Sequence, residues 1–321
     1  MQVSFVIPLY NCLSLTQAMV ASLQASLPAH LPHEIILVDD GSTDGTREWL
    51  ATLPPPFRVV LNERNLGYAA ANNRGAALAR GELLALLNND LVLLPGWLEP
   101  MLAAHRSLGR RAGLVGNVQF DARTGKIDHT GIVINLKGKP EHQRGWPDGF
   151  SHFFTTVYPV VALTGACALL ERSLWNQLGG FDEGYLNSCE DVDLCFRARS
   201  AGRINVVALR SHVRHHVSSS LNRKRSDEKN AYRLTHRWQA ELAECAARRW
   251  CRSYFASSPL EPRVHGYGFE WQIWLYALGF GHIPPAKAVA AMQAAIGLEL
   301  ARWEEMFGGS GAAKPPPHWV L

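Results

Sequence analysis

The sequence lacks a hydrophobic run long enough to cross a membrane, for which roughly 18 consecutive apolar residues are needed. Its most apolar late segment, FEWQIWLYALGF at 269–280, is shorter than that. The chain opens on VSFVIPLYN without the charged leader and cleavage site of a secretory signal. We therefore expect a cytoplasmic protein, or at most one that is peripheral to the inner face of a membrane.

The few cysteines of the chain argue against a structural zinc site and against a disulfide framework. The chain has six cysteines, and no two of them stand in the CxxC spacing of a zinc site. Cysteines of a cytosolic chain are normally reduced and unpaired. We expect neither a disulfide framework nor a structural zinc site.

Two glycine-rich phosphate loops are also missing. No GxGxxG motif follows the first apolar run, and no GxxxxGK[ST] motif occurs anywhere in the chain. These loops are the signatures of dinucleotide-binding Rossmann domains and of P-loop nucleotide hydrolases. Their absence argues against both classes.

What the chain does contain is a strand-then-helix pattern, repeated four times in the first 110 residues. Such alternation with short connections predicts an α/β fold with a mostly parallel sheet flanked by helices. Polar turns follow three of the strands, and in open α/β sheets such turns line one ligand-binding crevice. They comprise Pro8, Tyr10 and Asn11; Asp39 and Asp40; and Asn88, Asn89 and Asp90.

The stretch LLALLNND at 83–90 is the centre of this pattern. It is a short apolar run, typical of a strand covered on both faces, and it ends abruptly in two amides and a carboxylate. Asp90 is therefore a candidate metal-binding or phosphate-handling residue. The alternative is a loop aspartate that caps the next helix.

The second half of the pattern is less regular. We predict a buried strand over 160–170, a short helix over 171–178, a helix from Leu194 to Ser200 and a strand over 204–207. The acids in CEDVD at 189–193 either serve chemistry or are stabilised by the dipole of the helix that follows. The histidines of HVRHH at 212–216 are either metal ligands or structural side chains.

The last third of the chain is expected to be helical, with two apolar seams that indicate packing rather than a cofactor site. One seam comprises Leu234, Trp238, Leu242 and Cys245, and the other comprises Val289, Met292, Ile296, Leu300, Trp303 and Phe307. Residues 210–252 hold eleven lysines and arginines against four acids. Such a block suits a phosphate-bearing partner or an anionic membrane, or it is a solvated helix face. The aromatic segment 269–280 either lies at a membrane interface or buries against the catalytic domain, and we favour burial. No nucleic-acid partner is expected.

A series of motifs resembles a known family. IPLYN, VDDGSTDGT, NLGYAAANNRG, LLNND, GGFDEGY and CEDVDLCFRARSAG occur in order over residues 3–220. Together they resemble the inverting family-2 glycosyltransferases with the GT-A fold. Asn88-Asn89-Asp90, in place of the usual Asp-x-Asp, resembles a bacterial subgroup that includes rhamnosyltransferases.

The resemblance implies a role for each matching residue. The implied nucleoside contacts are Pro8, Tyr10, Asn11, Asp39 and Asp40, and the implied nucleotide-sugar pocket adds Asn65, Gly67, Asn73, Asn88 and Asn89. Asp90 and His215 would bind Mg²⁺ or Mn²⁺, with His216 in place of His215 if the register shifts by one. Asp191 and Glu190 would be the catalytic residues, with Asp191 as the base and Glu190 orienting the acceptor or supporting the loop. Gly165 would also contact the acceptor, and Asp193 would cap the helix.

The resemblance implies an inverting transfer from a nucleotide sugar, dTDP-rhamnose or a UDP-sugar, to a hydroxyl of a bacterial surface glycan or glycolipid. Expected partners are this donor, a glycan or lipid-linked acceptor, and a membrane touched peripherally by the basic and aromatic C-terminal region. Two alternatives remain: a non-catalytic relative that binds nucleotide sugars or glycans, and a nucleotidyltransferase, whose glycine-rich loop is missing.

The expected domains are a catalytic domain over 1–225, a helical region over 226–307 and a flexible tail over 308–321. The catalytic domain would consist of a nucleotide-sugar half over 1–110 and an acceptor half over 111–225.

Overall fold

The computed structural model describes residues 2–147, 155–216, 227–256 and 271–308. The chain divides into two compact units, the first formed by Met1–Ile132 and His142–Ser226, the second by Val133–Glu141 and Asp227–Leu321. The predicted boundary after residue 225 and the tail from 309 onwards lie outside the described residues. Assignment of 133–141 to the second, helical unit was not predicted from the sequence.

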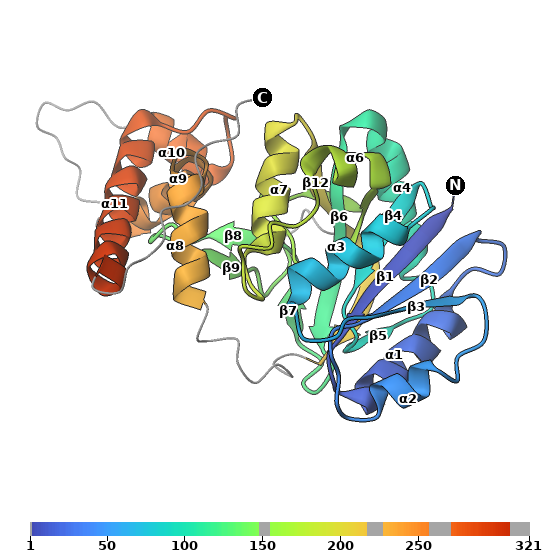
Figure 1. The fold of residues 1–321 in the computed structure, drawn as a ribbon. Helices are drawn as coiled ribbons and strands as arrows, with labels where there is room; N and C mark the ends of the chain where they lie inside the picture. Colours follow the sequence, from blue (N-terminus) through green and yellow to red (C-terminus); the bar gives the residue numbers. More distant parts are fainter. Residues whose placement is uncertain (1, 148–154, 217–226, 257–270, 309–321) are drawn as a thin grey trace, which may run out of the picture. The chain divides into compact units, whose positions relative to one another are not determined.

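The first half of the first unit is a run of alternating strands and helices (Figure 1). Four of its strands are parallel and lie in the order β3-β2-β1-β4. Its elements are β1 (Val3–Leu9), α1 (Leu13–Ser26), β2 (His33–Asp39), α2 (Thr46–Leu50), β3 (Phe57–Leu61), α3 (Tyr68–Leu78) and β4 (Leu83–Leu87).

The second half of this unit extends the sheet with antiparallel and parallel strands, in the order β4-β11-β6-β12-β10. Strand β11 is antiparallel to both of its neighbours, whereas β6 and β12 are parallel. The elements are β5 (Leu91–Leu93), α4 (Leu98–Leu108), η1 (Gly109–Arg111), β6 (Ala112–Asp121), β7 (Ile127–His129), β10 (Val157–Pro159), β11 (Cys167–Glu171), α6 (Arg172–Leu178), α7 (Glu190–Ser200) and β12 (Ile204–His215). Strands β8 (Ile132–Ile134) and β9 (Pro140–His142) pair in a separate two-stranded sheet, whose residues 133–141 belong to the second unit.

Helices cover both faces of the parallel strands, which explains why these strands are apolar throughout. On one face, Phe5 and Ile7 share a core cluster with residues of α1, α2 and α4. On the other face, α3 lies so close that a Cβ at Gly75 would come within 2.5 Å of Val6 Cγ1. Only glycine therefore fits at this point of α3, and the close contact fixes α3 beside the carboxyl ends of β1 and β2.

The structure corrects three of the predicted element bounds. The expected strand over 160–170 begins only at Cys167, because the backbone at Thr164 and Gly165 bonds to side chains instead of a neighbouring strand. The expected helix over 194–200 begins earlier, at Glu190. The expected strand over 204–207 continues to His215 and pairs with β6 and β5.

The described residues of the second unit form four helices, which pack with the hairpin tip 133–141. Both predicted apolar seams are packing surfaces, since Leu234 and Leu242 of one and Met292 and Trp303 of the other are fully buried. None of the described helices is both long and apolar enough to span a bilayer. The helices are α8 (Asp227–Arg237), α9 (Gln239–Ala256), α10 (Trp271–Leu278) and α11 (Ala286–Gly308).

Candidate active site

The turn after β1 is tied to the turn after β2. Asn11 and the next residue, Cys12, both adopt left-handed backbone conformations, with φ of 54° and 61°. Such conformations are uncommon outside glycine and are typically held by the surrounding structure. Here Asn11 Oδ1 accepts a bond from Thr43 N at 2.8 Å, and Asn11 N donates to Ser42 Oγ at 2.8 Å. The two predicted nucleoside-binding turns therefore form one structure.

Asp39 and Asp40 are both buried and hold neighbouring loops in place. Asp40 accepts bonds from Leu66 N at 2.9 Å and from Gly67 N at 2.8 Å. Asp39 lies 2.7 Å from Arg47 Nε of α2. Gly67, with φ of 95°, supplies a backbone conformation that side-chain-bearing residues rarely adopt.

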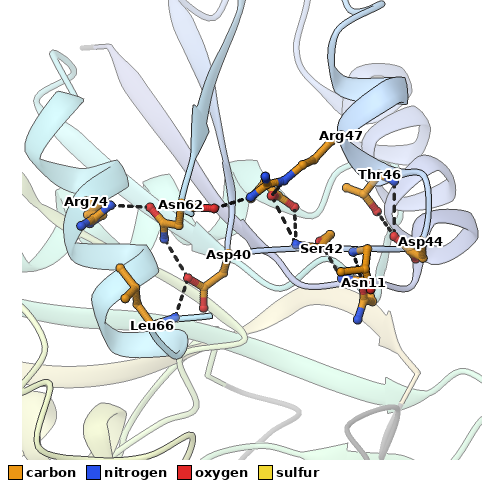
Figure 2. A network of polar contacts seen from close by, with 11 residues as sticks. Asn11, Asp40, Ser42, Asp44, Thr46, Arg47, Asn62, Leu66 and Arg74 are labelled. Atoms are coloured by element: carbon orange, nitrogen blue, oxygen red, sulfur yellow. Dashed lines mark hydrogen bonds and ion pairs between the residues drawn. The ribbon is translucent and has the colours of Figure 1, made fainter. Parts of the chain in front are cut away.

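Asn62 connects these loops and was not identified from the sequence. It is fully buried, and its Nδ2 donates to Asp40 Oδ1 at 2.7 Å. Its Oδ1 accepts from Arg74 of α3 at 2.7 Å, and its backbone carbonyl accepts from Arg47. Figure 2 shows Asn62 between the two arginines and Asp40. This network orders the end of β2 and the loop before α3.

The other predicted nucleotide-sugar residues follow the same strand ends. Pro8 is buried in β1 opposite Val38, whereas the Tyr10 side chain is 51% exposed. Asn65 is exposed, and its backbone lies against Gly41, where a Cβ would come within 2.7 Å of Asn65 N.

Asn73 of α3 clamps the loop that precedes α7. Its Oδ1 accepts from Phe181 N at 2.9 Å, and its Nδ2 donates to Phe181 O at 2.9 Å and to Glu183 Oε1 at 2.8 Å. An amide that bonds both backbone groups of one residue acts like a short piece of β-ladder. The predicted pocket residue thus also positions the loop leading to the candidate base.

Asp90 and His215 come together although 125 positions separate them in the chain. His215 Nε2 lies 3.1 Å from Asp90 Oδ1, and the two side chains are 12% and 11% exposed. Pairing of β5 with β12 causes this convergence, because His215 stands opposite Leu91. His216 follows the strand, is exposed, and bonds Asp90 O only through its backbone N.

The spacing of this pair fits a divalent metal. Two neighbouring ligands of an octahedral ion, each about 2.1 Å from the metal, stand about 3 Å apart. His215 Nδ1 and Asn88 Oδ1 are buried without a hydrogen-bond partner among the described residues. No group of three or more His, Cys, Asp or Glu with metal-binding geometry occurs in that part of the chain. Further ligands would come from substrate phosphates and water, as Mg²⁺ commonly accepts.

The two asparagines before Asp90 are anchored differently. Asn89 Nδ2 donates to Thr16 Oγ1 of α1 at 2.9 Å. Asn88 N donates to Ala166 O at 2.8 Å, which joins the end of β4 to the start of β11. The NND stretch is therefore fixed from both sides.

Asp191 stands in the first turn of α7, and the Gly165 peptide holds it. Asp191 Oδ2 accepts from Gly165 N at 2.8 Å. Gly165 O in turn accepts from the Tyr68 hydroxyl at 2.9 Å. A Cβ at Gly165 would lie 3.0 Å from that hydroxyl and 3.4 Å from Asp191 Cβ, so the close approach favours glycine. The predicted base and the predicted acceptor contact are therefore direct neighbours.

Tyr68 links the two halves of the site. Its role was not predicted, because the sequence pattern indicates only that a helix begins at this residue. Burial, followed by the charges of Glu190, Asp191 and Asp90, raises the pKa of the Tyr68 hydroxyl well above its usual value. The negative charges of carboxylates in the β4–β5 turn and in α7 thus both disfavour ionisation of the Tyr68 hydroxyl. The hydroxyl stays protonated and remains a hydrogen-bond donor.

Two further findings concern the surroundings of these carboxylates. Asp193 is not the helix cap that we predicted, because α7 begins at Glu190 and Asp193 bonds Arg197 Nε at 2.7 Å one turn later.

His129 is fully buried, and its Nε2 lies 3.3 Å from Thr164 N. Burial and the neighbouring His142 and His215 lower the pKa of His129 well below its usual value, which keeps its imidazole neutral.

Comparison with known proteins identifies the family. The model of "Glycosyl transferase family 2" matches residues 4–179, more than half of the chain. The chain belongs to glycosyl transferase family 2. The resemblance predicted from the sequence is thereby confirmed.

Three relatives are each 32% identical to this family-2 chain. The N-acetylglucosaminyl-diphospho-decaprenol L-rhamnosyltransferase of Mycobacterium tuberculosis matches over 62% of this chain and 71% of its own length. The O-antigen biosynthesis protein RfbC of Myxococcus xanthus matches over 68% of this chain and 18% of its own length. Protein y4gI of Sinorhizobium fredii matches over 82% of this chain and 29% of its own length. The chain thus spans less than a third of the length of two of these relatives.

A solved structure confirms the fold. The crystal structure of GalNAc-T7 with UDP, GalNAc and Mn²⁺ superposes with a TM-score of 0.62 and 20% sequence identity. The match covers 77% of this family-2 chain and 51% of that one. The prediction of a GT-A fold with a helical C-terminal region is confirmed.

Proposed function

We propose that this family-2 chain is an inverting glycosyltransferase. It would move a sugar from a nucleotide sugar, dTDP-rhamnose or a UDP-sugar, to a hydroxyl of a bacterial surface glycan or lipid-linked glycan. One observation carries the proposal: Tyr68 donates to Gly165, which holds Asp191, and the charge of Asp90, the partner of His215, also acts on the Tyr68 hydroxyl. The proposed transfer would use the Asp90–His215 pair to hold a divalent metal and Asp191 as the base.

The donor half would use the turns after β1, β2 and β4. Tyr10, Asn11 and Asp39 would contact the nucleoside, as the family motif implies. Asp90 and His215 would hold Mg²⁺ or Mn²⁺ against the diphosphate, and a divalent ion there offsets the charge of the leaving group. The GalNAc-T7 structure was solved with Mn²⁺, which supports a divalent ion without deciding between the two.

The chemical step would be a single displacement. The acceptor oxygen forms a bond to C1 of the sugar, the bond from C1 to the phosphate oxygen breaks, and a nucleoside diphosphate leaves. The acceptor hydroxyl gives its proton to an Asp191 carboxylate oxygen, which acts as general base. With no protein nucleophile, one displacement inverts the configuration at C1. Gly165 N fixes the Asp191 carboxylate, and Glu190, which is 5% exposed, would orient the acceptor.

The acceptor class rests on the relatives. The mycobacterial rhamnosyltransferase is named for a diphospho-decaprenol acceptor, and the Myxococcus protein for O-antigen biosynthesis. These names support a lipid-linked or surface-glycan acceptor and a rhamnose donor for this chain.

A panel of UDP-, dTDP- and GDP-sugars, each with and without Mn²⁺ or Mg²⁺, tests the proposal. A ligand that binds only the native state raises the melting temperature by mass action. We expect a metal-dependent rise with one nucleotide class, followed by release of its nucleoside diphosphate when a glycan or polyprenyl-diphosphate-linked sugar is added. Binding without release in the presence of such acceptors would indicate the non-catalytic relative. No binding to any donor would contradict the proposal.

A further inference from the structure

Helix α10 is apolar on both of its sides. Ile273, Tyr276 and Ala277 are buried in a core cluster with Ala247 and Cys251 of α9. The opposite side of α10 forms a stripe of exposed apolar side chains, and the loop after the helix exposes more of them. We call this set of side chains the α10 face. It comprises Trp271 (59% exposed), Trp274 (36%), Leu275 (40%), Leu278 (55%), Phe280 (64%) and Ile283 (86%).

The α10 face therefore needs an explanation. A helix that is hydrophobic all round is normally buried in a core or in a membrane. Single exposed apolar residues are ordinary, but a continuous patch with two tryptophans marks an interaction site. Burial of 269–280 against the catalytic domain stays a prediction, because the packing that the structure shows for α10 is on α9 of the same unit. Residues 269 and 270 lie outside the described part.

Basic side chains border this face, and acids are absent from its segment. Arg248 Nη2 donates to Gly281 O at 3.1 Å, and Arg252 Nε donates to Ala277 O at 2.9 Å. Lys287 is exposed and its Nζ lies 3.2 Å from Tyr254 Oη. No Asp or Glu occurs in the sequence from 271 to 298. Arg248 and Arg252 thus lie at the C-terminal end of α10 and at the loop that carries Phe280, whereas the two tryptophans lie in the first half of the helix.

We propose that the α10 face binds the surface of an anionic phospholipid bilayer, with α10 lying in the interfacial plane. Tryptophan prefers the boundary between headgroups and acyl chains, and cations beside it attract anionic lipid. The described part of α10 is eight residues long and is not long enough to span the hydrocarbon core, so the proposal has it lie on the membrane.

A second copy of the chain suits this face less well. In a symmetric dimer the same patch meets itself, so the interface would bring together the cations Arg248 and Arg252 of both copies. Like charges brought together across an interface oppose association. An anionic lipid surface satisfies the apolar side chains and the cations at once.

Sedimentation of the full chain with vesicles tests this inference. We expect at least tenfold stronger binding to phosphatidylcholine vesicles containing phosphatidylglycerol than to phosphatidylcholine alone, with binding that weakens at high salt. Tryptophan fluorescence should shift to shorter wavelength on binding. The inference does not depend on transfer activity, so an inactive chain that binds vesicles would overturn only the proposed function.

Two matched variants decide the result. The triple variant Trp271→Ser, Trp274→Ser, Phe280→Ser should lose at least tenfold in vesicle binding. The control Leu298→Ser, Met306→Ser removes side chains of α11 that are 75% and 47% exposed, and it should bind as the unmodified chain does. Melting curves check that each variant is folded. Equal loss in both variants, no vesicle binding, or a dimer that only the triple variant abolishes would overturn the inference.

Discussion

Asp191 is the residue whose substitution should separate binding from chemistry. In Asp191→Asn the amide keeps an oxygen that can accept the Gly165 N–H, but it cannot accept the acceptor's proton. We expect transfer to fall by roughly 10²–10⁴-fold, the usual contribution of a general base. Donor binding, read from the melting temperature, should remain. Transfer within a few fold of the unmodified chain would remove Asp191 as the base.

Asp90 is predicted to carry the metal dependence. Asp90→Asn removes the only carboxylate of the NND stretch, so the metal-dependent part of the donor-induced melting shift should disappear. Glu99→Gln, an exposed carboxylate substitution on α4, is the matched control and should leave that shift unchanged. A normal metal-dependent shift in Asp90→Asn would contradict the metal assignment.

Tyr68 is predicted to act as a positioning residue. Tyr68→Phe leaves Gly165 O without its donor, which costs about 1 kcal/mol of stability and loosens the peptide that holds Asp191. We expect a lower melting temperature and a reduced kcat, with little change in donor binding. A purely structural role would lower the melting temperature and leave kcat unchanged.

At the scale of whole elements, much of the parallel half was predictable. Apolar runs such as 83–87 are buried on both faces, so their sequence has no polar positions that make them ambiguous. The acceptor half was harder, because its geometry depends on distant contacts. The strand predicted over 160–170 is interrupted where Gly165 turns to Asp191, and β12 is extended by its pairing with β5. No local pattern reports such contacts.

Distant contacts also limited what could be predicted of the candidate active site. Strand ends and the family motifs indicated Asp90, Asp191 and His215, because polar residues after apolar runs are visible in a sequence. Asn62 and Tyr68 gave no such signal. Their importance comes from burial and from partners in other elements, which only the folded chain reveals.

The hairpin tip 133–141 is predicted to be an integral part of the helical unit. Gly138 has φ of 76°, and a Cβ there would lie 2.4 Å from Ile296 Cγ1 of α11. Gly138→Ala should therefore destabilise this unit by about 1–3 kcal/mol, the usual cost of overpacking, in addition to the backbone cost. Thermal unfolding followed by circular dichroism measures the change.

Gly281→Ala provides the control for this substitution. Gly281 has φ of 88° and no atom within 4 Å of the added Cβ, so the variant carries the backbone cost alone. Equal destabilisation by both substitutions would show that the hairpin tip does not pack against α11 as described.

For the whole molecule, the buried thiols predict a loss of stability at alkaline pH. Burial raises the pKa of Cys167 to about 12 and also raises the pKa of Cys195. Unfolded thiols ionise near pH 8.5, so above that pH the unfolded chain loses protons that the folded chain retains. Stability must then fall as pH rises, by up to about 1.4 kcal/mol per pH unit for each thiol, until the folded thiol ionises as well.

Melting temperatures compared at pH 7.5 and pH 10 measure this effect. The unmodified chain should show the larger drop, and the double variant Cys167→Ala, Cys195→Ala a smaller one. Cys12→Ala, which removes an exposed thiol, should leave the drop unchanged. An identical drop in the double variant would mean that other groups, such as the buried Tyr68 hydroxyl, govern alkaline unfolding. The comparison therefore tests whether Cys167 and Cys195 are as inaccessible as their burial implies.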